Sequence, residues 1–114
     1  LRDRRGRELP IFIGAFEAMS ILQALSGKPA ERPLSHDLVR TAVEKMGGRI
    51  ERVVIDDLWQ GTFYARIFVA RDGAETLEID ARPSDAIALA LRVTAPLFVA
   101  EGVLQEAGHA EDGG

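Results

Sequence analysis

The stretch that decides the fold runs from Glu78 to Arg92, EIDARPSDAIALALR, and leads from a strand into a helix. Its first part belongs to a strand predicted over Thr76–Ala81, where apolar and acidic side chains alternate between the two faces. Pro83 suits the first position of the helix, because a first-turn N–H has no partner within the helix. Residues Ala86–Leu91 are apolar on every side, which is typical of a helix that is buried all round. The sequence therefore predicts a central, buried helix.

Upstream of this helix the sequence is rich in β-forming residues. Strands are predicted over Arg49–Leu58 and Thr62–Arg71, with a turn at Asp57–Gly61 between them. The dipeptide Asp72-Gly73, which follows the second of these strands, is a strong hairpin signal. With the strand that ends at Ala81, these segments predict an antiparallel meander of three strands.

The N-terminal half is predicted to contain one more strand and two more helices. Alternating apolar residues favour an edge strand over Glu8–Gly14. Apolar residues then recur at helical spacing over Ala15–Leu25. A second helix is expected from Ser35, acting as its N-cap, to Met46, and the following pair of glycines would end it.

The C-terminal part is predicted to add a short strand over Leu97–Ala100 and a short helix over Glu101–Ala107. Together the elements predict an α+β domain, in which an antiparallel or mixed β-sheet packs with a buried central helix and two or three flanking helices. We expect the domain to occupy residues 1–108 and residues 109–114 to form a flexible tail. Because the chain begins in what resembles a strand end before a charged turn, we also expect an N-terminal strand to be missing.

Composition is typical of a soluble globular domain and excludes several kinds of site. The 114 residues fit one domain, with 46% hydrophobic and 28% charged residues. The absence of cysteine excludes disulfides, thiolate metal ligands and a cysteine nucleophile, and it suits a cytoplasmic location. No apolar run approaches the ~20 residues that span a bilayer, so no membrane partner is expected. The net charge of −4 argues against strong nonspecific binding of nucleic acid.

The densest group of chemically useful side chains lies where the strand meets the buried helix. Asp80, Arg82, Ser84 and Asp85 all come directly before the apolar segment. Two carboxylates beside a low-dielectric surface could hold a divalent cation or have shifted pKa values. The alternative is a structural role, in which Asp85 stabilises the helix dipole and Arg82 pairs with Asp80.

The starts of the two N-terminal helices carry further candidates. His36 and Asp37 stand side by side in a first turn, where His36 could act as a general base or metal ligand, or simply cap the helix. Glu17, early in the first helix, could be a metal ligand or an acid that favours the helix dipole. These residues by themselves leave both interpretations open.

Three residues of the β region could contact a substrate. Thr62 and Tyr64 share one face of a strand, and Trp59 at the preceding turn could stack on a base. Sheet packing explains the first two equally well, and Trp59 could instead cover the sheet edge. Motifs for phosphate-cradling and dinucleotide-binding glycine loops, serine nucleophile elbows and HExxH zinc sites are absent from the sequence.

Several stretches together resemble the bifunctional nuclease domain family of bacteria and plants. They follow the family's order and spacing and cover nearly the whole chain. The stretches are LPIFIGAFEA (residues 9–18), RPLSHDL (32–38), GTFYARI (61–67), IDARPSDAIALALR (79–92) and PLFVAEGVLQEAG (96–108). The resemblance implies an α+β fold and nuclease activity on RNA and DNA.

The resemblance and the polar cluster together suggest a metal-assisted phosphodiesterase that acts on nucleic acid. Oxygen ligands would hold Mg²⁺ or Mn²⁺, supplied by Glu17, Asp80 and Asp85. Arg82 would stabilise charge that develops on phosphorus, and His36 would act as general acid or base. The family's motifs imply a further catalytic residue, Asp37, and a substrate-binding set of Thr62, Tyr64 and Ser84.

Two other hypotheses use the same residues without hydrolysis. In the first, the chain is a non-enzymatic, oligomeric interaction module, and Arg82 only anchors the buried helix by pairing with Asp80 or Asp85. The acidic net charge favours this hypothesis. In the second, the helix N-terminus binds a small anion, although Asp85 would repel it. Because small domains with exposed strand edges often associate, we expect a homo-oligomer, a dimer.

Overall fold

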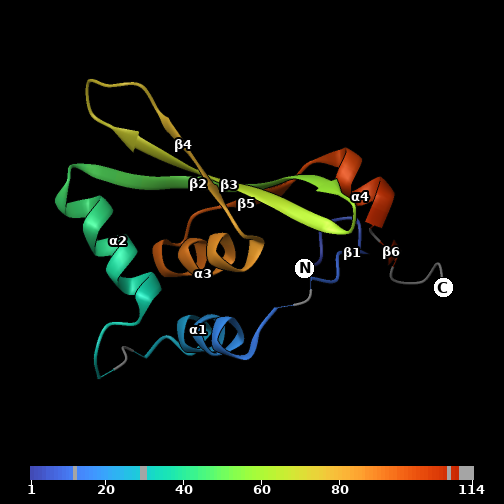
Figure 1. Cartoon of the computed structure of the whole chain (residues 1–114), viewed down its shortest axis with the longest axis horizontal. Coiled ribbons are helices and arrows are strands. Elements are labelled where there is room, and N and C mark those ends of the chain that lie inside the picture. The colour runs from blue at the N-terminus through green and yellow to red at the C-terminus, as the bar shows by residue number, and fades with distance from the viewer. Residues whose placement is uncertain (12, 29–30, 108, 111–114) are drawn as a thin grey trace.

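The structure is a computed structural model that describes residues 1–11, 13–28, 31–107 and 109–110. In the first half of the chain the elements are β1 (Arg7–Glu8), α1 (Ala15–Leu25), α2 (Ser35–Lys45), β2 (Gly48–Trp59) and β3 (Thr62–Arg71). The second half adds β4 (Leu77–Ala81), α3 (Pro83–Val93), β5 (Leu97–Val99), α4 (Glu101–Ala107) and β6 (His109–Ala110). They form an α+β fold, as the sequence predicts, with α3 between the main sheet and α1 (Figure 1).

The main sheet is mixed and has the strand order β4-β3-β2-β5. β2, β3 and β4 form the predicted antiparallel meander, and β5 runs parallel to β2. The turn between β2 and β3 is shorter than the predicted Asp57–Gly61, because Asp57 pairs with Tyr64 and β2 continues to Trp59. Gly61 and Gly73 have φ of 76° and 69°, a backbone conformation that glycine adopts without steric cost.

Helix α3 is the buried centre of the domain, as predicted, but it is not buried on every side, because Ile87 is half-buried and Leu91 is 37% exposed. The buried residues of its apolar stretch are Ala86, Ala88, Leu89 and Ala90. Ala86, Leu89 and Ala90 share one core with residues of β2 and β3, namely Ile50, Val53, Ile55, Ala65, Ile67 and Val69. Because α3 is packed between the main sheet and α1, the backbone at its two ends has a fixed position, from which the side chains there extend.

Helices α1 and α2 lie at the predicted positions but leave much apolar surface uncovered in the described structure. In α2 no residue is buried, and the predicted apolar stripe includes Leu38 and Met46, which are 64% and 84% exposed. The predicted N-cap is wrong by one residue: Leu34 is the N-cap, and Ser35 is already helical. The Leu34 N–H donates to the Asp37 carboxylate at 2.8 Å, which satisfies the helix start without a serine cap. Among the described helices none is long and apolar enough to cross a membrane.

The predicted strand over Glu8–Gly14 is wrong for most of its length. Among the described residues from the N-terminus to Gly14, a strand forms at Arg7–Glu8 alone, and this strand, β1, pairs with β6. Pro10 has no N–H to continue a ladder, and the side chain of Leu9 is instead inserted into the core, where it is 1% exposed. Phe12 lies outside the described residues. Of the predicted tail, His109–Ala110 pair with β1, and residues 111–114 lie outside the described residues.

Candidate active site at the start of helix α3

Arg82 links the starts of two helices at the surface. It is the N-cap of α3, and its Nε and Nη2 donate to the carboxylate of Asp85 at 3.0 and 3.3 Å. Its Nη1 donates to Oε1 of Glu17 at 2.9 Å. Glu17 and Asp85 are each the third residue of their helix, α1 and α3, where the helix dipole favours a negative charge. The predicted pair of Arg82 with Asp80 does not form, and the predicted pair with Asp85 does.

His36 brings a third helix to the same place. It is the second residue of α2, and its side chain is only 13% exposed. Its Nε2 lies 2.8 Å from Oδ1 of Asp85, and its Nδ1 lies 2.6 Å from Oγ of Ser20 on α1. Glu17, His36, Arg82 and Asp85, which we call the α3 cluster, therefore come from three helices that are distant in sequence.

The α3 cluster is charged at neutral pH. Burial by itself would raise the pKa of the Asp85 carboxyl, but hydrogen bonds from Arg82 and His36 hold that pKa below its usual value. The same pairing with Asp85, and then with Glu17, raises the pKa of Arg82. Apart from His36, the two carboxylates and the guanidinium leave one negative charge uncompensated.

Two adjoining hollows open beside the α3 cluster. The first has a volume of about 420 Å³, and its walls include Phe16, Met19, Gln23 and the whole cluster. The second, of about 310 Å³, extends toward the β2–β3 turn, and its walls include Thr62, Phe63 and Ser84. Glu17 and Arg82 border both. Hollows of this size are typical of small-ligand sites, and the Arg82 side chain, 66% exposed, is accessible from solvent.

The family is decided by comparison with known sequences. The chain matches the bifunctional nuclease domain over residues 1–112. It belongs to the bifunctional nuclease domain family. An uncharacterized protein of Mycobacterium tuberculosis (strain ATCC 25618 / H37Rv) is 44% identical over 109 residues, which cover 95% of this chain and 64% of that protein.

Two plant proteins named Bifunctional nuclease 1 are more distant relatives. The protein of Oryza sativa subsp. japonica is 32% identical over 93 residues, covering 80% of this chain and 28% of the relative. The protein of Arabidopsis thaliana is 29% identical over 101 residues, covering 87% of this chain and 31% of the relative. This bifunctional nuclease domain thus spans under two thirds of the mycobacterial protein and about a third of the plant proteins.

Three residues predicted for the site lie apart from the α3 cluster of this bifunctional nuclease domain. Asp80 is exposed on β4, opposite Arg66 of β3, and has no ion pair within the described residues. Tyr64, on β3, is paired with Asp57 of the neighbouring strand β2. Asp37 accepts from Arg92 at 2.7 Å and from the Leu34 N–H, so its carboxylate serves the start of α2.

The predicted metal site does not fit the arrangement of the carboxylates. Glu17 and Asp85 both point their oxygens at the guanidinium of Arg82. Asp80, the third predicted ligand, is exposed on β4, where it lies opposite Arg66 of β3. Over the described ranges of the chain, no group of three His, Asp or Glu side chains could hold a metal ion.

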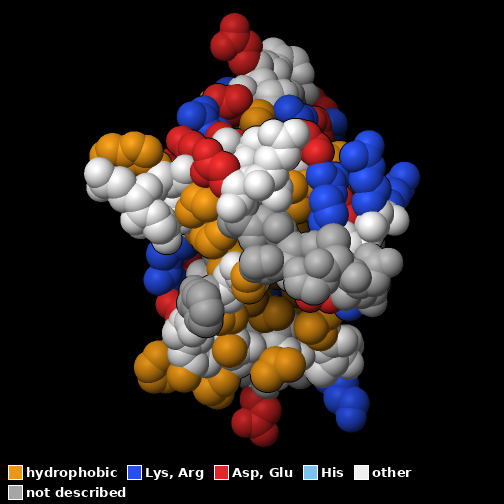
Figure 2. All heavy atoms as spheres, turned by 90° about the vertical axis from the view of Figure 1, so that its right-hand side faces the viewer, with side chains coloured by type: hydrophobic (Ala, Val, Ile, Leu, Met, Phe, Trp, Pro, Cys, Tyr) orange, Lys and Arg blue, Asp and Glu red, His pale blue; other side chains and the backbone are white. Residues whose placement is uncertain are grey.

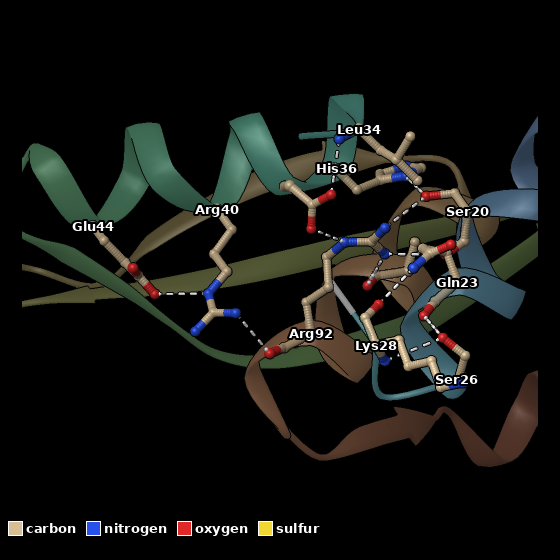
Figure 3. Close-up of polar contacts among 11 residues, drawn as sticks. Ser20, Gln23, Ser26, Lys28, Leu34, His36, Arg40, Glu44 and Arg92 are labelled. Atoms are coloured by element: carbon tan, nitrogen blue, oxygen red, sulfur yellow. Dashed lines mark hydrogen bonds and ion pairs between the residues drawn. The ribbon is translucent and has the colours of Figure 1, made fainter. Parts of the chain in front are cut away.

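Sequence analysis does not single out Ser20 and Arg92. Ser20 contacts His36 of the α3 cluster, and Arg92 contacts Ser20. Ser20 is 6% exposed, and the side chain of Arg92 is 5% exposed. Arg92 donates to the Ser20 carbonyl and hydroxyl at 3.3 and 3.0 Å, to the Ala88 carbonyl and to Asp37. Figure 3 shows its guanidinium directed at Ser20. The available signal was a serine within the apolar sequence of α1, since a buried hydroxyl requires partners.

A larger hollow, of about 790 Å³, lies at the other end of the domain, between the N-terminal arginines and β5. Figure 2 shows basic and acidic side chains intermingled on this face. Arg7 is paired there with Asp3 and Glu101, so its charge is already compensated. Because none of the residues predicted to carry chemistry line this hollow, we place the candidate site at the α3 cluster.

Proposed function

We propose that this domain hydrolyses phosphodiester bonds of RNA and DNA at the α3 cluster. The observation that supports the proposal is the convergence of Glu17, His36, Arg82 and Asp85 beside an open hollow. Membership of the bifunctional nuclease domain family, which includes plant proteins named as nucleases, adds to it. A cytoplasmic location remains part of the proposal, since a chain without cysteine suits a reducing compartment.

Arg82 is the group best suited to meet a phosphate. A guanidinium can donate two parallel hydrogen bonds to phosphate oxygens, and this one is exposed and has carboxylates as its partners. A bound phosphodiester would replace one carboxylate on Arg82. That carboxylate, of Glu17 or Asp85, would then be free to orient a water molecule beside the phosphorus.

Hydroxyl groups in the second hollow extend the site along a substrate. Thr62 and Ser84 line this hollow next to Arg82, and both could donate to sugar or phosphate oxygens. Tyr64 and Asp37, which were predicted on family motifs, would act only through neighbouring residues. No step of the proposal uses a divalent cation, and the predicted Mg²⁺ or Mn²⁺ dependence is tested by comparing cleavage in chelator with cleavage in either ion.

Two aspartates of the same segment provide a matched test. In Asp85→Asn the partner of Arg82 and His36 loses its charge, so cleavage of single-stranded RNA and DNA should fall by ~100-fold or more. Asp80→Asn is the control, because its exposed side chain lies outside the α3 cluster. Circular dichroism would check that both variants are folded. Equal activity in all three proteins, or no cleavage by the wild type, would contradict the proposal.

The exposed apolar face of α1 favours a second function, association with another copy of this chain. On α1 the side chains of Phe16, Met19, Leu22 and Leu25 are 61–85% exposed. Figure 2 shows hydrophobic side chains gathered at the bottom of the molecule, at the level of α1. Monomers rarely expose a contiguous apolar patch of this kind. A second copy is the simplest occupant, because one apolar helix face complements itself across a two-fold axis.

Light scattering after gel filtration tests this association. The wild type should have the mass of a dimer, and Leu22→Glu should have the mass of a monomer. Trp59→Glu is the matched control, because Trp59 is equally exposed, at 61%, but lies on the β2–β3 turn. A monomeric wild type would contradict the association and leave the nuclease proposal intact.

A further inference from the structure

Ser20, His36 and Asp85 form a continuous chain of hydrogen-bonding groups. Ser20 Oγ lies 2.6 Å from His36 Nδ1, and His36 Nε2 lies 2.8 Å from Asp85 Oδ1. All three residues line the first hollow, and Ser20, which is 6% exposed, is the most buried of them. Which atoms carry the protons decides what His36 can do.

The buried end of this chain is fixed by Arg92. A guanidinium has N–H donors and no acceptor, so at 3.0 Å Arg92 Nη2 must donate to Ser20 Oγ. Three more of its five N–H groups donate to Asp37, the Ala88 carbonyl and the Ser20 carbonyl, and these bonds hold the guanidinium in place. The single proton of the Ser20 hydroxyl is then available for His36 Nδ1.

The other end of the chain requires the same arrangement. The ionised Asp85 carboxylate can only accept hydrogen bonds, so the 2.8 Å contact places a proton on His36 Nε2. If Nδ1 also carried a proton, the Ser20 oxygen would receive hydrogen bonds from two cationic side chains in a buried position. The neutral ring with its proton on Nε2 satisfies all three residues.

We infer that Ser20 is a positioning residue, which donates to His36 Nδ1 and holds the imidazole in the Nε2–H form directed at Asp85. His36 then has no free lone pair facing the hollow. If the domain hydrolyses phosphodiesters as proposed, His36 serves to orient Asp85. A carboxylate of the α3 cluster, and not His36, then accepts the proton from water. Neither the family motifs nor the α3 cluster alone assigns a role to Ser20.

Nitrogen NMR of the whole chain tests the assignment without any activity measurement. In ¹⁵N-labelled protein at about pH 8, where an ordinary imidazole is neutral, long-range ¹H–¹⁵N spectra separate protonated from unprotonated ring nitrogens. His109→Gln identifies the signals of His36, since the chain has two histidines. We expect a protonated Nε2 and an unprotonated Nδ1. The opposite pattern, or a mixture of the two forms, would overturn the inference.

Variants separate the role of Ser20 from that of Asp85. Asp85→Asn removes the obligatory acceptor at Nε2, and if Ser20 holds the ring the Nε2–H form should persist. Adding Ser20→Ala should then give a mixture of the two forms, and Ser20→Thr in its place should restore a single form. A mixture already in Asp85→Asn alone would show that Ser20 does not position the ring.

A cleavage assay tests the consequence for the reaction. Gln at position 36 can still donate to Asp85 but cannot accept a proton as imidazole does. His36→Gln should therefore lose less than ~10-fold in cleavage, whereas removal of an essential general base costs ~10²–10⁴-fold. A loss in that larger range, or labelling of Ser20 by a fluorophosphonate, would overturn the positioning role. If the wild type cleaves nothing, the proposed function fails and the NMR result still decides the inference.

Discussion

Helix α3 carries an arginine at each end, and the two have opposite surroundings. The side chain of Arg92 is 5% exposed and that of Arg82 is 66% exposed. Arg92 donates to a hydroxyl, a carboxylate and two backbone carbonyls, and the carbonyls are fixed by the helices to which they belong. Arg82 donates only to side-chain carboxylates, which can rotate away. The same residue type is therefore an internal tie between helices at one end and an accessible anion partner at the other.

The largest effect is expected from Arg92→Met. This change removes the hydrogen bonds to Asp37, to the buried Ser20 hydroxyl and to two backbone carbonyls, and each buried polar group left without a partner costs ~1–3 kcal/mol. Urea unfolding would measure the free energy of unfolding. Arg49→Met is the control, because Arg49 is 66% exposed and pairs with Asp72, which is fully exposed. The comparison of the two ends of α3 would be wrong if Arg92→Met were as stable as the control.

Arg82→Gln should have the opposite effect, with little loss of stability and a large loss of cleavage. Its urea midpoint should stay close to that of the wild type, because exposed ion pairs contribute little to stability. Cleavage should fall ~100-fold or more, since the group that meets the phosphate is removed. Arg66→Gln is a matched control, as Arg66 is also an exposed arginine that pairs with two carboxylates, Asp56 and Glu78. Equal cleavage by both variants would remove the proposed role of Arg82.

Acid should weaken the fold through the carboxylates at both ends of α3. Burial opposes the shift, but hydrogen bonds from Leu34 and Arg92 hold the pKa of Asp37 below its usual value of 3.8, and those from Arg82 and His36 do the same for Asp85. A lowered pKa in the folded state contributes stability above pH 3.8 that is lost as the pH falls through the folded value. Urea unfolding at decreasing pH should show this loss in the wild type.

Asp37→Asn and Asp85→Asn separate the two contributions to this acid loss. Each variant should be less stable than the wild type at neutral pH and should lose less on acidification. If the ion pair with Arg92 stabilises the fold more than the pair with Arg82, the free energy of unfolding should depend less on pH in Asp37→Asn than in Asp85→Asn. Identical pH dependence in wild type and both variants would show that neither carboxylate is linked to folding.

The smallest effect is expected from Gly14→Ala. A Cβ atom on Gly14 would clash with Oε2 of Glu17, so the carboxylate would have to move away from its position beside Arg82. Because the end of a flexible side chain moves easily, stability should change by less than ~1 kcal/mol, while cleavage should fall several-fold. Gly102→Ala on α4, where a Cβ meets nothing within 4 Å, should leave cleavage unchanged.

Some elements could be predicted from the sequence because their signals are local. The Asp72-Gly73 hairpin, the alternation along β3 and the proline start of α3 each depend on a few neighbouring residues, and the structure confirms all three. The same local reasoning was wrong for Glu8–Gly14, because a period of two indicates an extended chain and does not supply a partner strand.

The α3 cluster shows where local reasoning ends. Asp80 and Asp85 are close in sequence, yet the turn from β4 into α3 separates them, so of the two only Asp85 meets His36 and Arg82, and Arg82 in turn meets Glu17. Sequence alone determined that acids and an arginine would stand at the entrance of a buried helix. The packing of α1 and α2 around α3 decided which of them touch, and it also brought in Ser20 and Arg92. The reason is physical: periodicity reports the burial of each segment, whereas side-chain contacts depend on how whole segments pack.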